Sequence, residues 1–553
     1  MSRIGAAAGA LAVATALVLA GCSTGTETAP ADTDATAIVS VNGSEPQNPL
    51  VPANTNETGG GKIIDNLFAG LVYYNEKGEP QNDLAESIET TDSQNYTIKI
   101  KAGEKFTNGE EITAKSFVDA WQWAALLSNA ALNSYFFEDI QGFSYEEDSE
   151  LTGLKVVDDQ TFTVALNAPR SDFPLRLGYS AFYPLPSVAY DDIAAFGENP
   201  IGNGPYKLAA EGAWEHNVKI ELVVNPDYTG GRKPVNGGLS IVFYATQDAA
   251  YAALLGEDLD ILDAIPESAL KTYNDDLGDR AINVPSAIFQ SITIPSDTTN
   301  FSKPDVYEHF QGEEGNLRRQ AISHAIDRDT ITDVIFDGTR TPAHDFTSPV
   351  IDGYSEDVPG SDVLEYDEAK AKDLWAQADA ISPWEGTFTI SYNADGGHAS
   401  WVDAVANSIK NVLGIDAEGD PYPTFAEVRT LISKNADGKR EIDSTALRTG
   451  WQADYPGLFN FLGPIYATNA GSNDGDYSNP EFDALLDQGS EAATTEEANK
   501  YFQDAQAILF QDLPAIPLWY STVQAGYGEN VQNVAIDWHS VPLYYQVTKS
   551  ATK

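Results

Sequence analysis

The sequence is short of the residues that form disulfides and thiolate metal sites. It contains one cysteine and six histidines among 553 residues. A single thiol can neither form a disulfide within the chain nor build a thiolate zinc site. The histidines are scattered, and none belongs to a His-Glu-x-x-His motif. The sequence therefore argues against a dedicated metalloenzyme, and we expect neither a metal nor another cofactor.

Basic residues are also scarce. Lysine and arginine number 32 against 83 acidic residues, which gives a formal net charge of −51. So acidic a surface repels phosphate backbones, and no basic patch interrupts it, so we expect no nucleic-acid partner. Hydrophobic residues make up 42% of the chain, enough for a large core. At about 150 residues per domain, the length predicts three to four compact units.

Common phosphate-binding, calcium-binding and hydrolase motifs are missing. Residues 59–62 (GGGK) lack the upstream glycine and the following hydroxyl of a phosphate loop, and they predict a mobile turn. Residues 473–476 (NDGD) lack the glutamate that closes a calcium loop, and they predict a solvated turn. No Gly-x-Ser-x-Gly elbow occurs. With 83 carboxylates, any choice of an acid–base pair for hydrolysis is arbitrary.

The N-terminus carries a targeting pattern. Residues 1–21 combine Arg3 with an Ala-, Leu- and Val-rich stretch, which predicts a secretory signal peptide. The following Cys22 completes Leu-Ala-Gly-Cys, which resembles the lipobox of bacterial lipoproteins, where the cysteine is lipidated after cleavage. The competing interpretation is an ordinary signal peptide with a chance cysteine. Residues 22–37 predict a flexible linker. No other apolar run reaches the roughly 18 to 20 residues that cross a bilayer.

The rest of the chain alternates strand and helix patterns. Period-two alternation predicts half-buried strands around residues 37–41, 96–100, 162–166 and 218–222. Helical spacing predicts helices over 113–125, 316–336, 401–413 and 495–510, the first with Thr113 as a cap. Gly- and Pro-rich turns at 202–205 and 225–228 mark possible crossovers between lobes. No internal repeat is visible, which excludes solenoids and propellers. The mixture of strands and helices indicates an α/β or α+β architecture with more than one lobe.

Ordered sequence blocks run from about residue 38 to the C-terminus. One of them, Phe106 to Phe117, is similar to a family signature F-x-[ND]-G-x-x-[VI]-T-A-x-D-F, with Ser116 where aspartate is usual. Together they resemble the extracellular solute-binding proteins of peptide ABC importers, the oligopeptide- and dipeptide-binding family 5. The remaining blocks are residues 42–47 (NGSEPQ), 65–71 (DNLFAGL), 84–88 (LAESI), 202–206 (GNGPY), 225–228 (NPDY), 256–261 (GEDLDI), 317–328 (LRRQAISHAIDR), 392–393 (YN) with His398, 450–455 (GWQADY), 477–483 (YSNPEFD) and 514–518 (PAIPL).

The resemblance implies a fold and a domain division. It implies a two-lobe periplasmic-binding-protein-like fold (type II, cluster C) with an accessory domain, in which the lobes close around a ligand by a hinge motion. The predicted segments are the signal peptide (1–21), the linker (22–37), lobe I (38–67, 204–285 and 528–553), the accessory domain (68–203) and lobe II (286–527).

The resemblance also implies a ligand site for a peptide. A peptide offers an α-ammonium, a main chain and a terminal carboxylate as handles that do not depend on its sequence. In the family pattern, Asp454 pairs with the ammonium, and Arg448 takes the carboxylate of a short peptide. The other implied residues are His398 and Arg429 for longer peptides, Trp451 as the wall of a side-chain pocket, and Glu45 and Tyr135 along the cleft.

Four of these residues also have a structural interpretation. Asp454 fits a cap or surface carboxylate, and Arg448 fits a structural ion pair. His398 fits a helix start, and Trp451 fits plain core. For Arg429, the segment that leads to Arg448 is longer than in the family pattern.

The predicted function is capture without catalysis. The chain is expected to be a monomeric lipoprotein on the outer face of a bacterial cell membrane that binds oligopeptides and delivers them to the permease subunits and ATPases of an ABC importer. A second hypothesis keeps the fold but replaces the peptide with a non-peptide solute such as an oligosaccharide, a nickel complex or an opine. A surface hydrolase and an adhesin are hypotheses from different functional classes.

Overall fold

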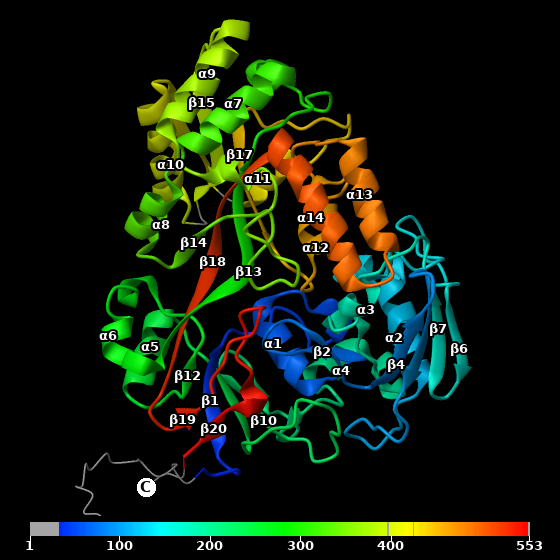
Figure 1. Ribbon diagram of the computed structural model, residues 1–553. Coiled ribbons are helices and arrows are strands. Elements are labelled where there is room, and N and C mark those ends of the chain that lie inside the picture. Colours follow the sequence, from blue (N-terminus) through cyan, green and yellow to red (C-terminus); the bar gives the residue numbers. More distant parts are fainter. Residues whose placement is uncertain (1–32, 395–396, 424, 551–553) are drawn as a thin grey trace, which may run out of the picture.

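Two long antiparallel strands connect the two halves of the molecule. The structure is a computed structural model that describes residues 33–394, 397–423 and 425–550 (Figure 1). We call the part that contains α7 to α14 the upper half, and the part that contains α1 to α6 with β1 to β12 the lower half. Strands β13 (Ala281–Thr293) and β18 (Ala515–Tyr527) run between them, paired from Ala281 with Gly526 to Thr293 with Ala515. A register shift between Pro285 and Phe289 interrupts the ladder.

These two strands are the middle of one twelve-stranded mixed sheet. Its strands in spatial order are β16 (Asp416–Tyr422), β15 (Thr387–Asn393), β17 (Ala446–Gln452), β13, β18, β12 (Ile261–Leu262), β1 (Ile38–Gly43), β11 (Gly238–Phe243), β10 (Lys219–Val224) and β8 (Tyr206–Leu208), with β14 (Arg340–Pro342) on β18 and β9 (Trp214–Glu215) on β10. Parallel pairs such as β1 with β11 and β15 with β16 lie next to antiparallel ones. The fold is therefore mixed α/β, as the sequence predicts.

A separate four-stranded sheet lies in the lower half. Its order is β4 (Ala85–Thr90), β5 (Asn95–Ile100), β7 (Thr161–Ala165) and β6 (Leu154–Asp158). Tyr96, Ile98 and Ile100 are buried and alternate with exposed residues, which confirms the predicted period of two. Phe117 and Trp121 of α2 (Ala114–Ala125) pack on Phe162 of β7, with ring centroids 5.9 and 5.5 Å apart. Two small sheets pair β2 (Val72–Tyr74) with β3 (Pro80–Asn82) and β19 (Val531–Gln532) with β20 (Thr548–Lys549).

The predicted helices are present, but one of them is divided in two. Thr113 caps α2 in a capping box with Ser116, as predicted. The predicted helix over 316–336 is two helices, because extended backbone at Ile326 ends the first and the Asp327 side chain caps the second. The helices are α1 (Thr58–Leu67), α2, α3 (Phe173–Arg176), α4 (Ile193–Glu198), α5 (Gln247–Leu255), α6 (Tyr273–Leu277), α7 (Gly312–Ala325), α8 (Arg328–Phe336), α9 (Glu368–Ile381), α10 (Ala399–Leu413), α11 (Phe425–Ile432), α12 (Leu458–Tyr466), α13 (Pro480–Glu491) and α14 (Thr495–Asp512).

The prediction of a mobile turn at the glycine run 59–61 is wrong. These residues form the first turns of α1, and the Glu57 side chain accepts a hydrogen bond from the Gly60 amide at 2.8 Å. Gly59 also lies against Ser44, so that an added Cβ would be 2.5 Å from the Ser44 hydroxyl oxygen. The glycines therefore allow close packing at a helix start.

The domain division stays a prediction, although Figure 1 shows where its segments lie. The segments predicted as lobe I and accessory domain are in the lower half, and helices α7 to α14 of predicted lobe II are in the upper half. Cys22 and the predicted signal peptide lie outside the described residues. At the end of the predicted linker, the Asp34 amide donates to the Lys549 carbonyl at 2.9 Å, which joins this segment to the C-terminal strand.

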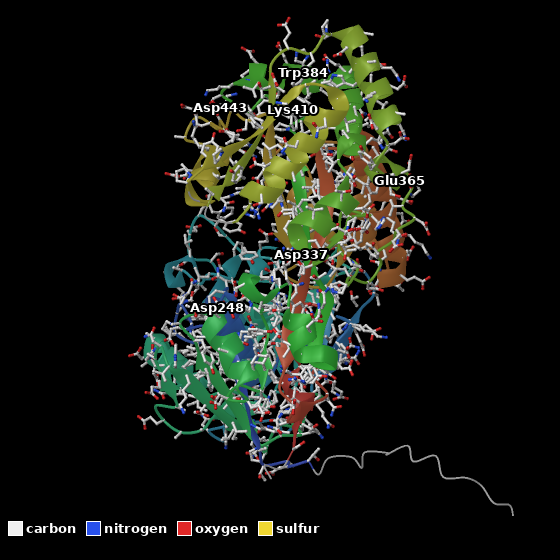
Figure 2. All side chains as sticks on the ribbon, turned by 90° about the vertical axis from the view of Figure 1, so that its left-hand side faces the viewer. Asp248, Asp337, Glu365, Trp384, Lys410 and Asp443 are labelled. Atoms are coloured by element: carbon white, nitrogen blue, oxygen red, sulfur yellow. The ribbon has the colours of Figure 1, made fainter. Side chains whose placement is uncertain are left out.

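The outer surface carries many acidic side chains. Figure 2 shows Asp248, Asp337, Glu365 and Asp443 on the outside of the molecule, and all four are exposed. Among the described residues, no helix is both long and apolar enough to span a bilayer.

Candidate functional site

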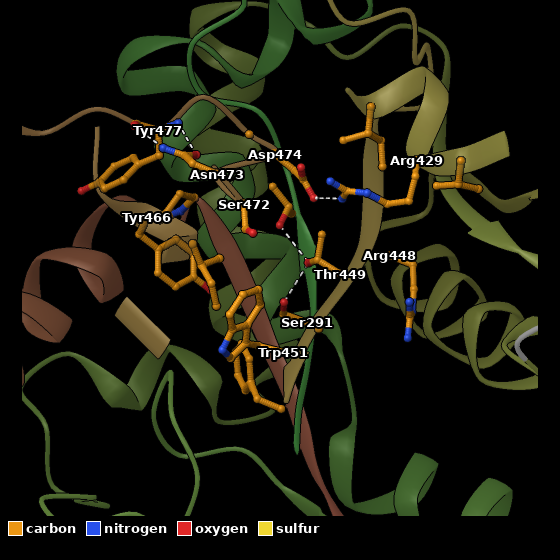
Figure 3. A pocket seen from close by; sticks show the side chains of 18 of the residues that line it. Ser291, Arg429, Arg448, Thr449, Trp451, Tyr466, Ser472, Asn473, Asp474 and Tyr477 are labelled. Atoms are coloured by element: carbon orange, nitrogen blue, oxygen red, sulfur yellow. Dashed lines mark hydrogen bonds and ion pairs between the residues drawn. The ribbon is translucent and has the colours of Figure 1, made fainter. Parts of the chain in front are cut away.

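Two cavities lie along the end of β17. The upper pocket, about 230 Å³, is lined by residues of β13, β15, β17, α11 and α12 and of the loop at 472–477 (Figure 3). The lower pocket, about 260 Å³, is lined by residues of α1, β2, the segment 178–183 and the segment 537–545. Trp451 lines the upper pocket, and the next three residues, Gln452 to Asp454, line the lower one. The chain therefore passes from one cavity directly into the other.

The floor of the upper pocket is polar and its walls are partly aromatic. The Thr449 hydroxyl lies 2.8 Å from the hydroxyls of both Ser291 and Thr293, so that the three form a row across β13 and β17. Trp451 and Tyr466 lie beside this row, and the Trp451 indole donates to the Asn460 side-chain oxygen at 3.0 Å. Hydroxyl groups and aromatic faces together accept both polar and apolar side chains.

Arg448 lines the upper pocket as a half-buried cation that has no anionic partner in the described part of the chain. Its closest hydrogen-bond acceptor is the Gln290 side-chain oxygen, 3.5 Å from Nη2, and its Nε is buried without any hydrogen-bond partner. Among the residues that the structure describes, no carboxylate lies within ion-pair distance of Arg448. Burial lowers its pKa to about 10. An anion that entered the pocket would find an unneutralised guanidinium.

Arg429 also lines the upper pocket, but its charge is compensated. Its Nη1 lies 2.7 Å from the Asp474 carboxylate, which is also 3.9 Å from Arg440 (Figure 3). Burial raises the pKa of Asp474, and Arg429 opposes that shift. The prediction of a solvated turn at 473–476 is therefore wrong, because Asn473 is buried and Asp474 and Asp476 form ion pairs with arginines.

Asp454 is a largely buried carboxylate in the lower pocket. Its Oδ2 accepts a hydrogen bond from the Asn460 amide at 3.1 Å, and its own backbone amide donates to the Asn460 side-chain oxygen at 2.8 Å. Burial raises the pKa of Asp454, and Asn460 and then the Arg176 charge oppose this shift. Over the described part of the chain, no cation lies within ion-pair distance of this carboxylate. Such a site favours an incoming cation.

An aromatic stack faces Asp454 from the lower half. Tyr135 lies in a short 3-10 helix (Ser134–Phe137). Its ring packs at a tilt against Phe136, which stacks on Tyr179, with centroid distances of 4.6 and 4.3 Å. Burial, followed by the Asp454 charge, raises the pKa of both tyrosines, so all three side chains belong to one neighbourhood. Tyr179 lines the lower pocket, whereas Tyr135 is 41% exposed beside it.

Besides Tyr135, two further predicted site residues line neither pocket. Glu45 accepts from the Asn217 amide and lies 2.7 Å from the His216 ring, which also contacts Glu198 at 2.9 Å. His398 precedes α10 and accepts a hydrogen bond from the Trp401 indole at 3.1 Å. The predicted role of both residues in ligand binding stays a prediction.

The lower pocket holds further charged groups that the sequence interpretation missed. Asp537 accepts two backbone hydrogen bonds at 2.9 Å, and burial raises its pKa to about 7. Asp65 accepts from the Tyr183 hydroxyl at 3.1 Å, and burial raises its pKa. Lys62 of the glycine-rich run points to Asp263, with which it forms an ion pair. The sequence interpretation gave none of these residues a role in the site, because they come together only in the folded chain.

Comparisons with known proteins give one consistent family. Residues 79–473 match the model of the bacterial extracellular solute-binding proteins, family 5 Middle. The chain is 26% identical to the oligopeptide-binding protein OppA of Bacillus subtilis over 509 residues, 88% of each chain. It is also 26% identical to the periplasmic murein peptide-binding protein MppA of Escherichia coli over 474 residues, 83% of each.

Solved structures show the same fold. The unliganded open form of the murein tripeptide-binding protein MppA matches with a TM-score of 0.78 at 22% identity, and the match covers 94% of this chain and 98% of that one. Haemophilus influenzae OppA in complex with RPPGFSPFR matches with a TM-score of 0.69 at 21% identity, over 94% of this chain and all of that one.

Proposed function

This chain belongs to the bacterial extracellular solute-binding proteins of family 5, and from that premise we propose that it captures oligopeptides for an ABC importer. The observation that carries the proposal is a pair of uncompensated charges of opposite sign along one strand end. Asp454 and Arg448 are six residues apart, so at about 3.3 Å per residue their Cα atoms are at most about 20 Å apart. An extended peptide of a few residues presents its two terminal charges over such a span.

In this proposal, the ligand neutralises both charges. The α-ammonium pairs with Asp454, and the terminal carboxylate pairs with Arg448. Side chains of the peptide enter the upper pocket, where Trp451 and the hydroxyl row accept varied groups through direct and water-mediated contacts. Main-chain hydrogen bonds add affinity without regard to sequence. Hinge motion about β13 and β18 then closes the two halves on the ligand.

The cellular setting belongs to the same proposal. A monomeric protein, lipidated at Cys22 after removal of a signal peptide, would stay on the outer face of the cell membrane beside its permease. The named relatives are an oligopeptide-binding and a murein peptide-binding protein, which favours a peptide over a sugar or a metal complex. Binding proteins make and break no bond in their ligand, so we propose no catalysis.

Calorimetry with matched peptides tests the proposal. A protein that lacks residues 1–22 is incubated with a peptide digest, washed and denatured, and the released peptides are identified by mass spectrometry. A synthetic tetrapeptide chosen from them, its N-acetylated form and the Asp454→Asn variant are then compared by titration. We expect intact peptides, and an affinity loss of at least tenfold on acetylation or substitution, because a charge-assisted hydrogen bond contributes about 1.5–3 kcal/mol. Recovery of no peptide, or of a degraded digest, would contradict the proposal.

A further inference from the structure

A contact between the two halves lies directly beside Asp454. Residues 171–176, just before and within α3, pack against residues 455–459 and 489–490 of the upper half, and we call this contact the seam (Figure 1). The Ser171 amide donates to the Ser490 carbonyl at 2.7 Å, and its hydroxyl donates to the Gly489 carbonyl at 2.8 Å. The seam therefore has a backbone framework as well as side-chain contacts.

Arg176 is the centre of the seam. Its side chain is 11% exposed, and its guanidinium forms ion pairs with Asp139 at 2.7 Å and with Asp172 at 3.0 Å. The same guanidinium lies 5.3 Å from the ring centroid of Tyr455, within the range of a cation–π contact. The Tyr455 hydroxyl donates to Asp172 at 2.5 Å. Tyr455 is thus held by Arg176 at its ring and by Asp172 at its hydroxyl.

Tyr455 immediately follows Asp454 in the chain. The seam contacts of Tyr455 therefore fix the backbone that carries the Asp454 carboxylate. On the other side, Asn460 bonds both the Asp454 carboxylate and the Asp454 amide. Asn460 bonds the carboxylate, and Arg176, Tyr135, Tyr179 and Tyr455 lie near enough to interact with it electrostatically. Burial raises the pKa of all three tyrosines, which keeps them neutral at physiological pH. Among these described groups, Arg176 is the one that carries a charge.

We propose that Arg176 is a positioning residue of the ammonium site, which holds Asp454 in place through Tyr455. Arg176 lies outside both pockets and touches no ligand in this proposal. The inference rests on the proposed capture of peptides at Asp454. The proposal gives the predicted accessory domain (68–203) a part in recognising the ligand's positive charge, in addition to its packing role.

The test compares two neighbouring arginines. Arg170 is the matched control, because it pairs with the same Asp139 at 3.1 Å and lies 6.0 Å from the Phe459 ring centroid, but has no contact with Tyr455. Affinities for one tetrapeptide and for its N-acetylated form are measured by titration between pH 4.5 and 8 on the wild type, Arg176→Met, Arg176→Lys and Arg170→Met. The acetylated peptide has no ammonium and reports on the rest of the site.

We expect Arg176→Met to weaken binding of the free peptide by about tenfold or more at pH 7, since it removes the charge that stabilises the Asp454 carboxylate. The acid limb of the affinity profile should move to higher pH, because loss of the Arg176 charge raises the pKa of Asp454. Binding of the acetylated peptide should change by less than about twofold, and Arg176→Lys should restore much of the loss. Arg170→Met should move neither quantity.

Two outcomes would overturn the assignment. One is an equal loss for the free and acetylated peptides, which indicates general damage to the site. The other is an unchanged acid limb in Arg176→Met. If Arg176→Met fails to fold because Asp139 and Asp172 lose their partner, Tyr455→Phe decides, since it removes only the hydroxyl bond to Asp172 and should weaken the free peptide alone, by about threefold. Absence of peptide binding in the wild type would refute the proposed function instead, so the two failures are distinguishable.

Discussion

At the residue scale, two arginines in the same pocket differ in whether a carboxylate neutralises them. Arg448 has no carboxylate within ion-pair distance in the described chain, whereas Arg429 is 2.7 Å from Asp474. We therefore expect Arg448→Gln to weaken binding of a short peptide by about 10- to 100-fold, the loss of a charge-assisted hydrogen bond in a buried place. Titration calorimetry with a tripeptide measures this change.

Arg429→Gln is the matched control for that substitution. Because Asp474 takes up the Arg429 charge and keeps Arg440 at 3.9 Å when Arg429 is lost, this variant should change the affinity for the same tripeptide by less than about threefold. A C-terminally amidated tripeptide should bind wild type and Arg448→Gln alike. If the amidated peptide is as sensitive to Arg448→Gln as the free acid, Arg448 does not bind the carboxylate.

Two residues of the lower pocket should oppose each other in the pH dependence of stability. Burial lowers the pKa of His539 to about 4 and raises that of Asp537 to about 7. Between pH 4 and 6.5 the unfolded chain binds the His539 proton and the folded chain does not. The contribution of His539 to the free energy of unfolding therefore decreases as the pH falls. Over the same range the folded chain keeps the Asp537 proton and the unfolded chain releases it. The contribution of Asp537 to the free energy of unfolding therefore decreases as the pH rises.

His539→Gln removes the first dependence and leaves the second. Relative to wild type, the variant's free energy of unfolding should decrease more steeply from pH 4.5 to 6.5, by on the order of 1 kcal/mol per pH unit. Urea denaturation at three pH values gives these free energies. Parallel profiles for wild type and variant would show that His539 is not held neutral in the folded state.

Whether a charge is compensated could not be predicted from the sequence, even where its position was. The family resemblance led to Asp454, Arg448, Arg429 and Trp451, which the structure brings together in two adjoining pockets. It also led to Glu45, whose partner His216 is 171 residues away in the chain. Partners so distant are set by the tertiary fold, and neither local propensity nor spacing encodes them.

At the scale of elements, the glycines at 202 and 204 allow a loop to approach the end of α1. A Cβ at Gly202 would lie 1.9 Å from the Leu67 carbonyl oxygen, and the Asn203 side chain hydrogen-bonds both the amide and the carbonyl of Ala69. Gly202→Ala should therefore lower the free energy of unfolding by about 1–3 kcal/mol, because the backbone must shift. Thermal denaturation measures the change.

Gly61→Ala supplies the control in α1, the helix that the loop approaches, since a Cβ at Gly61 has no atom within 4 Å. Alanine has a higher helix propensity than glycine by about 1 kcal/mol, so this variant should be as stable as wild type or more so. Equal destabilisation by Gly202→Ala and Gly61→Ala would contradict the close-approach explanation.

Elements with a strong period were predictable, and their ends and breaks were less so. The strand at 96–100 and the helix at 113–125 have the predicted alternation and cap. The break at Ile326 and Asp327 is hidden in the sequence because apolar residues keep helical spacing across it, although Asp327 is a typical cap residue. Residues 59–62 predict a turn because glycine is a poor helix former, yet here it allows close packing against Ser44.

At the scale of the whole molecule, the excess of acidic residues acts beyond any single contact. With 83 acidic and 32 basic residues, the formal net charge is −51, and acidic side chains such as Asp248 and Asp443 lie on the outer surface (Figure 2). A field of one sign accelerates the encounter with ligands of the opposite sign and is screened over about 10 Å at 0.1 M salt. The protein should therefore capture cationic peptides faster than anionic ones.

Stopped-flow measurements with three tetrapeptides of net charge +2, 0 and −2 test this prediction. At about 20 mM salt we expect association rate constants to decrease in that order, by about tenfold or more across the series, because long-range attraction mainly changes the association rate. At about 500 mM salt the three rates should converge, since the Debye length falls to a few ångströms. The uncharged peptide is the internal control, because its rate should hardly respond to salt. Rates that ignore both ligand charge and salt would mean that the acidity of the surface has no part in capture.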